Sequence, residues 1–105
     1  MTFIEERRIV MDVLREVERA EAKHPGGRWA DGTWNGGMNL VKREQATNSC
    51  DRADREGCLT FAHILEEEFW EAMCEEDKVK LRAELVQCAA VCFRWLHKLD
   101  IEAGR

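Results

Sequence analysis

The sequence lacks several features that would place it in common classes of protein. No apolar run approaches the ~18 residues needed to cross a bilayer, and the N-terminus lacks the charged and then apolar stretches of a secretory signal. We therefore expect a cytoplasmic protein that does not bind membranes. None of the five cysteines forms a Cys-x-x-Cys pair, which argues against a zinc site or a disulfide framework and favours buried, reduced thiols.

Basic residues and phosphate-binding loops are also scarce. The 16 Lys and Arg residues are outnumbered by 21 Asp and Glu, so the net charge is -5 at pH 7. This acidic balance argues against nucleic-acid binding, which needs a basic patch to neutralise phosphates. Neither a Gly-x-Gly-x-x-Gly nor a Gly-Lys-Ser/Thr loop is present, so phosphate recognition would have to come from a metal ion and basic side chains.

The spacing of apolar residues predicts an all-α fold. With 105 residues the chain fits one domain, and we expect a single helical domain over residues 1–105. Four helices are predicted, over residues 3–23, 38–55, 60–76 and 78–100. Thr60 and Asp77 are the expected N-caps of the last two helices, and Gly57 is expected to terminate the second.

A loop is predicted over residues 24–39, which contain the only proline and five of the seven glycines. Trp29 and Trp34 lie in this loop, and indole rings are costly to leave in water. Either they cover the edge of the core, or they form a lid against a planar ligand. We favour core cover.

The helix expected over residues 60–76 carries acidic residues within the stripe that should be apolar. At about 100° per residue, Glu68 falls near the middle of the apolar face and Glu71 at its edge. Glu84, on the next helix, lies on the margin of that helix's apolar face. We therefore expect Glu68 to be largely buried.

Carboxylates on facing helices repel one another and lose hydration, so they persist most easily when a divalent cation pairs them. Ligands that offer only oxygen favour magnesium, or manganese, over zinc. From spacing alone an alternative stays open, in which Glu66, Glu67 and Glu71 are solvated and Glu68 is tolerated at the edge.

The helix over residues 78–100 is apolar nearly all round between Leu85 and Leu96. Three other short helices can hardly cover it, so we expect a homodimer or homotetramer. Its few polar groups fall within a band of roughly 80°. They are Glu84, Gln87, Arg94 and Lys98. At ~1.5 Å per residue the acidic and basic ends are about 10 to 20 Å apart, which suits a metal at one end and an anion at the other.

The acidic motifs resemble those of a known family. Glu67-Glu68-x-x-Glu71 followed by Glu84-x-x-Gln87 resembles the Glu-Glu-x-x-Glu and Glu-x-x-Asp motifs of the MazG-like, all-α nucleoside triphosphate pyrophosphohydrolases. Residues 59–68 and 81–91 look like a short, single-domain branch of this family, and the resemblance covers about the last half of the chain. It implies a bundle of about four helices, completed by oligomerisation.

The resemblance also implies a site and a reaction. Glu68, Glu71 and Glu84 would bind magnesium, and Glu67 would be an extra ligand or the base that orients water. Glu67 and Glu71 are thus the expected catalytic residues. Gln87 stands where the family has aspartate, and its carboxamide would be a ligand without charge. The reaction would cleave a nucleoside or deoxynucleoside triphosphate into the monophosphate and pyrophosphate.

Basic residues on the last helix often meet the phosphates in this family, which gives Arg94 and Lys98 a substrate-binding role. Lys23 and Arg43 are further candidates for phosphate contacts. The alternative function is a non-catalytic helical oligomer that binds nucleotides or a protein partner. A di-iron bundle is disfavoured, because the Glu-x-x-His ligand pair is missing.

Overall fold

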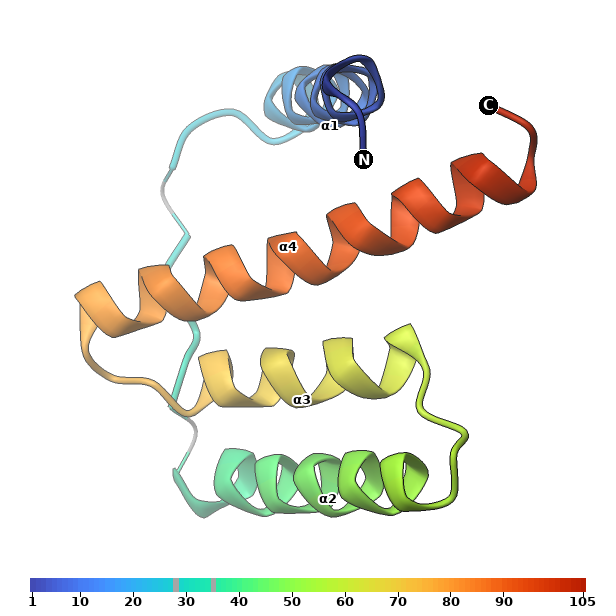
Figure 1. The fold of residues 1–105 in the computed structure, drawn as a ribbon. Coiled ribbons are helices and arrows are strands. Elements are labelled where there is room, and N and C mark those ends of the chain that lie inside the picture. The colour runs from blue at the N-terminus through green and yellow to red at the C-terminus, as the bar shows by residue number, and fades with distance from the viewer. Residues whose placement is uncertain (28, 35) are drawn as a thin grey trace. The chain divides into compact units, whose positions relative to one another are not determined.

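The computed structural model describes residues 1–27, 29–34 and 36–105, and in these ranges it contains four helices and no strand. The helices are α1 (Phe3–Lys23), α2 (Gly36–Arg55), α3 (Phe61–Met73) and α4 (Lys78–Glu102), as Figure 1 shows. The all-α prediction is therefore confirmed. None of the described helices combines the length and apolar character that a membrane crossing requires.

Local sequence signals explain most helix ends. The Thr60 hydroxyl accepts from the His63 N–H at 3.2 Å, and Asp77 Oδ1 accepts from the N–H groups of Val79 at 2.9 Å and Lys80 at 3.0 Å. These contacts confirm the two predicted N-caps. Gly57, at φ 72°, takes the left-handed conformation that ends α2, as predicted.

The end of α3 was predicted at Glu76 but lies at Met73. The Met73 carbonyl accepts from the Trp34 N–H at 2.8 Å and from the Asn39 side-chain amide at 2.9 Å. In a longer α3, the Met73 carbonyl would accept a hydrogen bond from an N–H of the same helix, but here the donors come from residues far away in the sequence. The apolar periodicity of α3 cannot predict these donors, so it did not predict where α3 ends.

The chain divides into two compact units. The first combines Met1–Ala30 with Phe93–Arg105, and the second spans Asp31–Cys92. In the first unit Ile9 is buried, and Glu5 Oε2 lies 3.0 Å from His97 Nε2. The organisation of residues 1–105 as a single domain stays a prediction.

In the second unit α2 and α3 run antiparallel and side by side (Figure 1). Ala46 and Ala53 on α2 and Ala72 on α3 are all buried. Ala46 and Ala53 are two turns apart and therefore share one helix face. Glu68 and Glu71 on α3 also approach Glu84, two turns into α4.

Several apolar side chains remain exposed in the single chain. On α4, Leu85 and Val86 are about half exposed, and the enclosure of this segment by further copies of the chain stays a prediction. All five cysteines are free thiols, but Cys58 and Cys92 are exposed and the other three only half-buried, so the expectation of buried thiols is wrong. Cys58 follows the turn at Gly57, and Cys92 shares the uncovered face of Leu85, two turns earlier on α4.

Candidate metal centre

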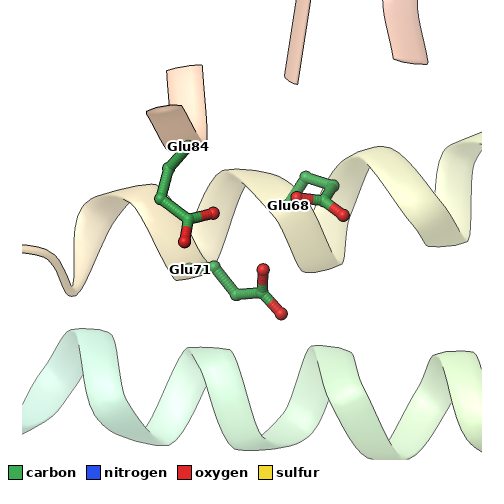
Figure 2. Close-up of side chains that lie close together, drawn as sticks. All are labelled: Glu68, Glu71 and Glu84. Carbon is green, nitrogen blue, oxygen red and sulfur yellow. The ribbon is translucent and has the colours of Figure 1, made fainter. Parts of the chain in front are cut away.

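Three glutamates from two helices converge in the second unit. Glu68 and Glu71 lie one turn apart on α3, and Glu84 lies two turns into α4. One carboxylate oxygen from each lies within 4.8 Å of the others. Figure 2 shows the Glu84 side chain extending from α4 toward the two α3 carboxylates. The i, i+3 spacing places the first two on one face, and the short connection to Asp77 sets where α4 begins.

Two of these carboxylates have an oxygen with no compensating contact. Glu68 Oε2 and Glu84 Oε2 are buried from solvent and have no hydrogen-bond partner. A buried acceptor without a donor is costly, and more so when it carries charge. Because all three side chains offer only oxygen, the donor set fits a hard divalent cation such as Mg²⁺ or Mn²⁺.

The spacing is also close to what one ion requires. Oxygens at adjacent positions of an octahedral Mg²⁺ ion are about 3.0 Å apart and oxygens at opposite positions about 4.2 Å, because each Mg–O bond is about 2.1 Å long. The three glutamate oxygens lie within 4.8 Å of one another, and side-chain rotations would bring them to such distances. The residues present therefore fit the ion that the sequence motif implied.

Burial and mutual repulsion both act on this cluster. Burial raises the pKa of Glu68, and the charges of Glu71, Glu84 and Glu67 raise it further. Burial likewise raises the pKa of Glu84, with contributions from Glu71 and Glu75. Each carboxylate is thus harder to ionise than usual unless positive charge is supplied.

Glu71 differs from the other two because a cation lies near it. Burial and the charge of Glu67 raise the pKa of Glu71, whereas the positive charge of Arg43 on α2 lowers it. Arg43 is exposed, so its guanidinium can meet a solvent-borne anion close to the cluster. This position is consistent with the predicted phosphate contact.

Glu67 and Gln87 border the cluster. Glu67 is half-buried, and its charge acts on both Glu68 and Glu71. It also faces α2, where burial raises the pKa of the Cys50 thiol and Glu67 adds to that rise. Gln87 is exposed one turn after Glu84. The roles of Glu67 as base and Gln87 as ligand stay predictions.

The other predicted substrate-binding residues lie in the first unit. Lys23 lines a surface depression of about 200 Å³ with Glu16, Arg19, Ala20 and His24. Lys98 forms an ion pair with Glu102, one turn further along α4. Arg94 is exposed on the same helix. A phosphate-binding role for these three residues stays a prediction, since the described cluster belongs to the second unit.

Sequence reasoning missed two groups beside the cluster. Glu75 raises the pKa of Glu84. Glu75 follows Glu71 by four residues, and this spacing could have predicted that both lie on the same side of the predicted helix. Cys88 lies one turn after Glu84. Burial raises the pKa of its thiol, and the charge of Glu68 is the next contribution.

We compared the chain with known proteins. No protein family matches the sequence, and comparisons with curated proteins and with solved structures found no match.

Proposed function

We propose that the protein is a magnesium-dependent nucleoside triphosphate pyrophosphohydrolase. The observation that carries the proposal is the convergence of Glu68, Glu71 and Glu84, with buried and unpartnered oxygens on Glu68 and Glu84. The cluster supports binding of a divalent cation. The resemblance of its motifs to those of the MazG-like pyrophosphohydrolases supports the choice of a nucleotide substrate.

Glu68, Glu71 and Glu84 would hold the ion, with Gln87 as a neutral ligand. When bound, such a cation polarises phosphorus–oxygen bonds and lowers the pKa of a coordinated water. Glu67 orients the attacking water and accepts its proton. The water oxygen bonds to the α phosphorus, and the bond from that phosphorus to the bridging oxygen breaks, so pyrophosphate leaves with the electron pair.

Arg43 has a complementary role in this proposal. Its guanidinium lies near enough to Glu71 to lower the pKa of that carboxylate. A planar guanidinium can donate two parallel hydrogen bonds to a phosphate. Arg43 would therefore hold the phosphate chain against the cluster. Lys23, Arg94 and Lys98 are kept as further proposed phosphate contacts.

The exposed apolar residues of α4 favour an oligomer, and they also fit an alternative function. Val86 is 53% exposed and Leu85 49% exposed on α4, which suits a helical oligomer that is completed by further copies of the chain. We propose a cytoplasmic homodimer or homotetramer. A non-catalytic oligomer that binds nucleotides or a protein partner would show the same exposed surface, so activity decides between these functions.

Release of pyrophosphate from a panel of ribo- and deoxyribonucleoside triphosphates tests the proposal. It should be measured with Mg²⁺, with Mn²⁺ and with a chelator. Glu68→Gln should abolish the metal-dependent release, whereas Glu66→Gln should leave it unchanged, because Glu66 is exposed and outside the cluster. If no nucleotide is hydrolysed with either metal, the alternative function, a non-catalytic oligomer that binds nucleotides or a protein partner, replaces the proposed one.

A further inference from the structure

Trp34 has an unusual backbone conformation. At φ 57° it is the only non-glycine residue with positive φ in the part of the chain that the structure describes. This left-handed region is sterically disfavoured for any side chain with a Cβ, and it is rare for a large aromatic residue. Such conformations persist where surrounding contacts impose them, and they concentrate at functional sites.

Three contacts hold the segment around Trp34 against the metal-binding helices. The Trp34 N–H donates to the Met73 carbonyl at 2.8 Å, and the buried Asn39 donates to the same carbonyl at 2.9 Å. Asp31 forms an ion pair with Lys78, the first residue of α4. The segment is thus tied to the end of α3 and to the start of α4, all within the second unit.

These contacts place Trp34 close to the carboxylate cluster. Met73 is two residues beyond Glu71, and successive Cα atoms are ~3.8 Å apart, so the Trp34 backbone N lies within about 13 Å of the Glu71 Cα. Arg43, which acts on Glu71, is one turn beyond Asn39 on α2. Cation ligands, a basic side chain and an aromatic ring therefore occupy one end of the second unit.

The indole of Trp34 is available to a ligand. It is 42% exposed, whereas Trp29 is 74% exposed and covers little of the core. Trp29 lies in the first unit, where its ring contacts His24 with a centroid distance of 5.5 Å. Trp34 is the tryptophan that combines exposure with an imposed backbone position beside the carboxylates.

We propose that the Trp34 indole is the stacking surface for the base of a nucleotide whose phosphates meet Arg43 and the Glu68, Glu71 and Glu84 cluster. This inference rests on the proposed function and deepens it. An indole face stacks on any nucleobase, so Trp34 separates nucleotides from phosphate chains that have no base. Its fixed backbone reduces the ordering that binding would otherwise require.

The test compares ligands with and without a base. The metal-loaded parent and its variants are titrated calorimetrically with α,β-methylene analogues of ATP, GTP, CTP and UTP, and with inorganic tripolyphosphate. Trp34→Ala should weaken binding of the analogues by roughly tenfold, as expected for loss of one stacked base, and leave tripolyphosphate binding unchanged. Trp34→Phe should retain most of the affinity, and Trp29→Ala should behave like the parent.

The outcomes separate this inference from the proposed function. If the parent binds Mg²⁺, the analogues and tripolyphosphate, but Trp34→Ala binds the analogues as tightly as the parent, the stacking role is wrong and the proposed function stands. Equal weakening of the analogues and tripolyphosphate also overturns it, since the loss would then not depend on the base. If the parent binds neither metal nor any phosphate ligand, both proposals fail.

Discussion

Glu68 on α3 and Glu84 on α4 lie close together, and each has a carboxylate oxygen that is buried from water and has no hydrogen-bond donor. Glu71 adds a third carboxylate within 4.8 Å. The metal-free fold therefore concentrates negative charge where it is poorly solvated. A divalent cation would offset that cost, so metal affinity and stability should respond to the same residues.

Neutralising either of these glutamates should remove activity without lowering the stability of the metal-free protein. Glu68→Gln and Glu84→Gln are expected to abolish metal-dependent hydrolysis and magnesium binding. They should leave the metal-free fold as stable as the parent, or more stable by up to about 1 kcal/mol, since a neutral amide is cheaper to bury than a carboxylate. Thermal melts and calorimetric titration with Mg²⁺ measure both effects. Unchanged turnover in one variant would remove that residue from the metal site.

The stability of the metal-free protein should fall as pH rises from mildly acidic to neutral. The pKa values of Glu68, Glu71 and Glu84 are raised above the ordinary 4.5, mainly by burial. The folded state therefore binds more protons than the unfolded state between 4.5 and the raised values, and it loses stability as these protons dissociate. Below that range Asp77 acts in the opposite sense, because the backbone N–H of Lys80 lowers its pKa.

Melts across pH 4.5 to 8, with and without saturating Mg²⁺, check this expectation. Magnesium binds the ionised carboxylates, so it should remove the loss of stability at the upper end of the range. A metal-free stability that rises steadily toward pH 8 would contradict the assignment of the cluster as a buried acidic centre.

Sequence patterns predicted the helices because helix formation here is encoded locally. Apolar periodicity identified all four helices, and Thr60, Asp77 and Gly57 gave three of their ends. The same periodicity placed Glu68 and Glu71 on one face of α3. These inferences need only the geometry of a single helix.

Contacts between segments far apart in the sequence could not be predicted in this way. The end of α3 depends on donors from Trp34 and Asn39, and the charge of Arg43 reaches Glu71 only because α2 packs against α3. Spacing alone left open whether Glu84 pairs with the α3 glutamates, and the family resemblance then favoured that pairing. Tertiary packing determines each of these relationships, and one sequence gives little information about it.

Backbone strain at Trp34 should be measurable without any ligand. Trp34→Ala and Trp34→Gly both remove the indole, so their difference reports the backbone alone. A left-handed conformation costs a residue with a Cβ about 1–2 kcal/mol, whereas glycine adds about 0.4–1 kcal/mol of unfolded-state entropy. Trp34→Gly should therefore be more stable than Trp34→Ala by about 0.5–1 kcal/mol in denaturant titrations. Equal stability, or a more stable alanine variant, would mean that the position is not held at positive φ.

Self-association should depend on the exposed apolar face of α4. At micromolar concentration we expect a mass of at least two chains in sedimentation equilibrium, because Leu85 and Val86 leave apolar surface on α4 that a second chain can cover. Leu85→Arg should shift the protein toward monomer. Val79→Arg is the matched control, since Val79 is 80% exposed at the first turn of the same helix. A monomeric parent with native helicity would contradict the proposed oligomer.

Replacing Gln87 by aspartate tests how the cluster extends along α4. Gln87 is exposed one turn after Glu84, where the resembling family has a carboxylate. Gln87→Asp should bind Mg²⁺ more tightly, because a fourth negative charge adds Coulomb attraction in a partly desolvated site. Without metal it should melt lower, because the new charge has no partner, and it should raise the pKa of a neighbouring carboxylate further.

The stability that Gln87→Asp gains on adding Mg²⁺ should then exceed the gain of the parent, as expected for a ligand that binds only the folded state. Isothermal titration and melts with and without the metal measure the two quantities. Ala89→Asp is the control, because it adds the same charge at an exposed position on a different face of α4. If Gln87→Asp and Ala89→Asp both match the parent in magnesium affinity and in metal-induced stabilisation, residue 87 does not face the metal, and the motif on α4 ends at Glu84.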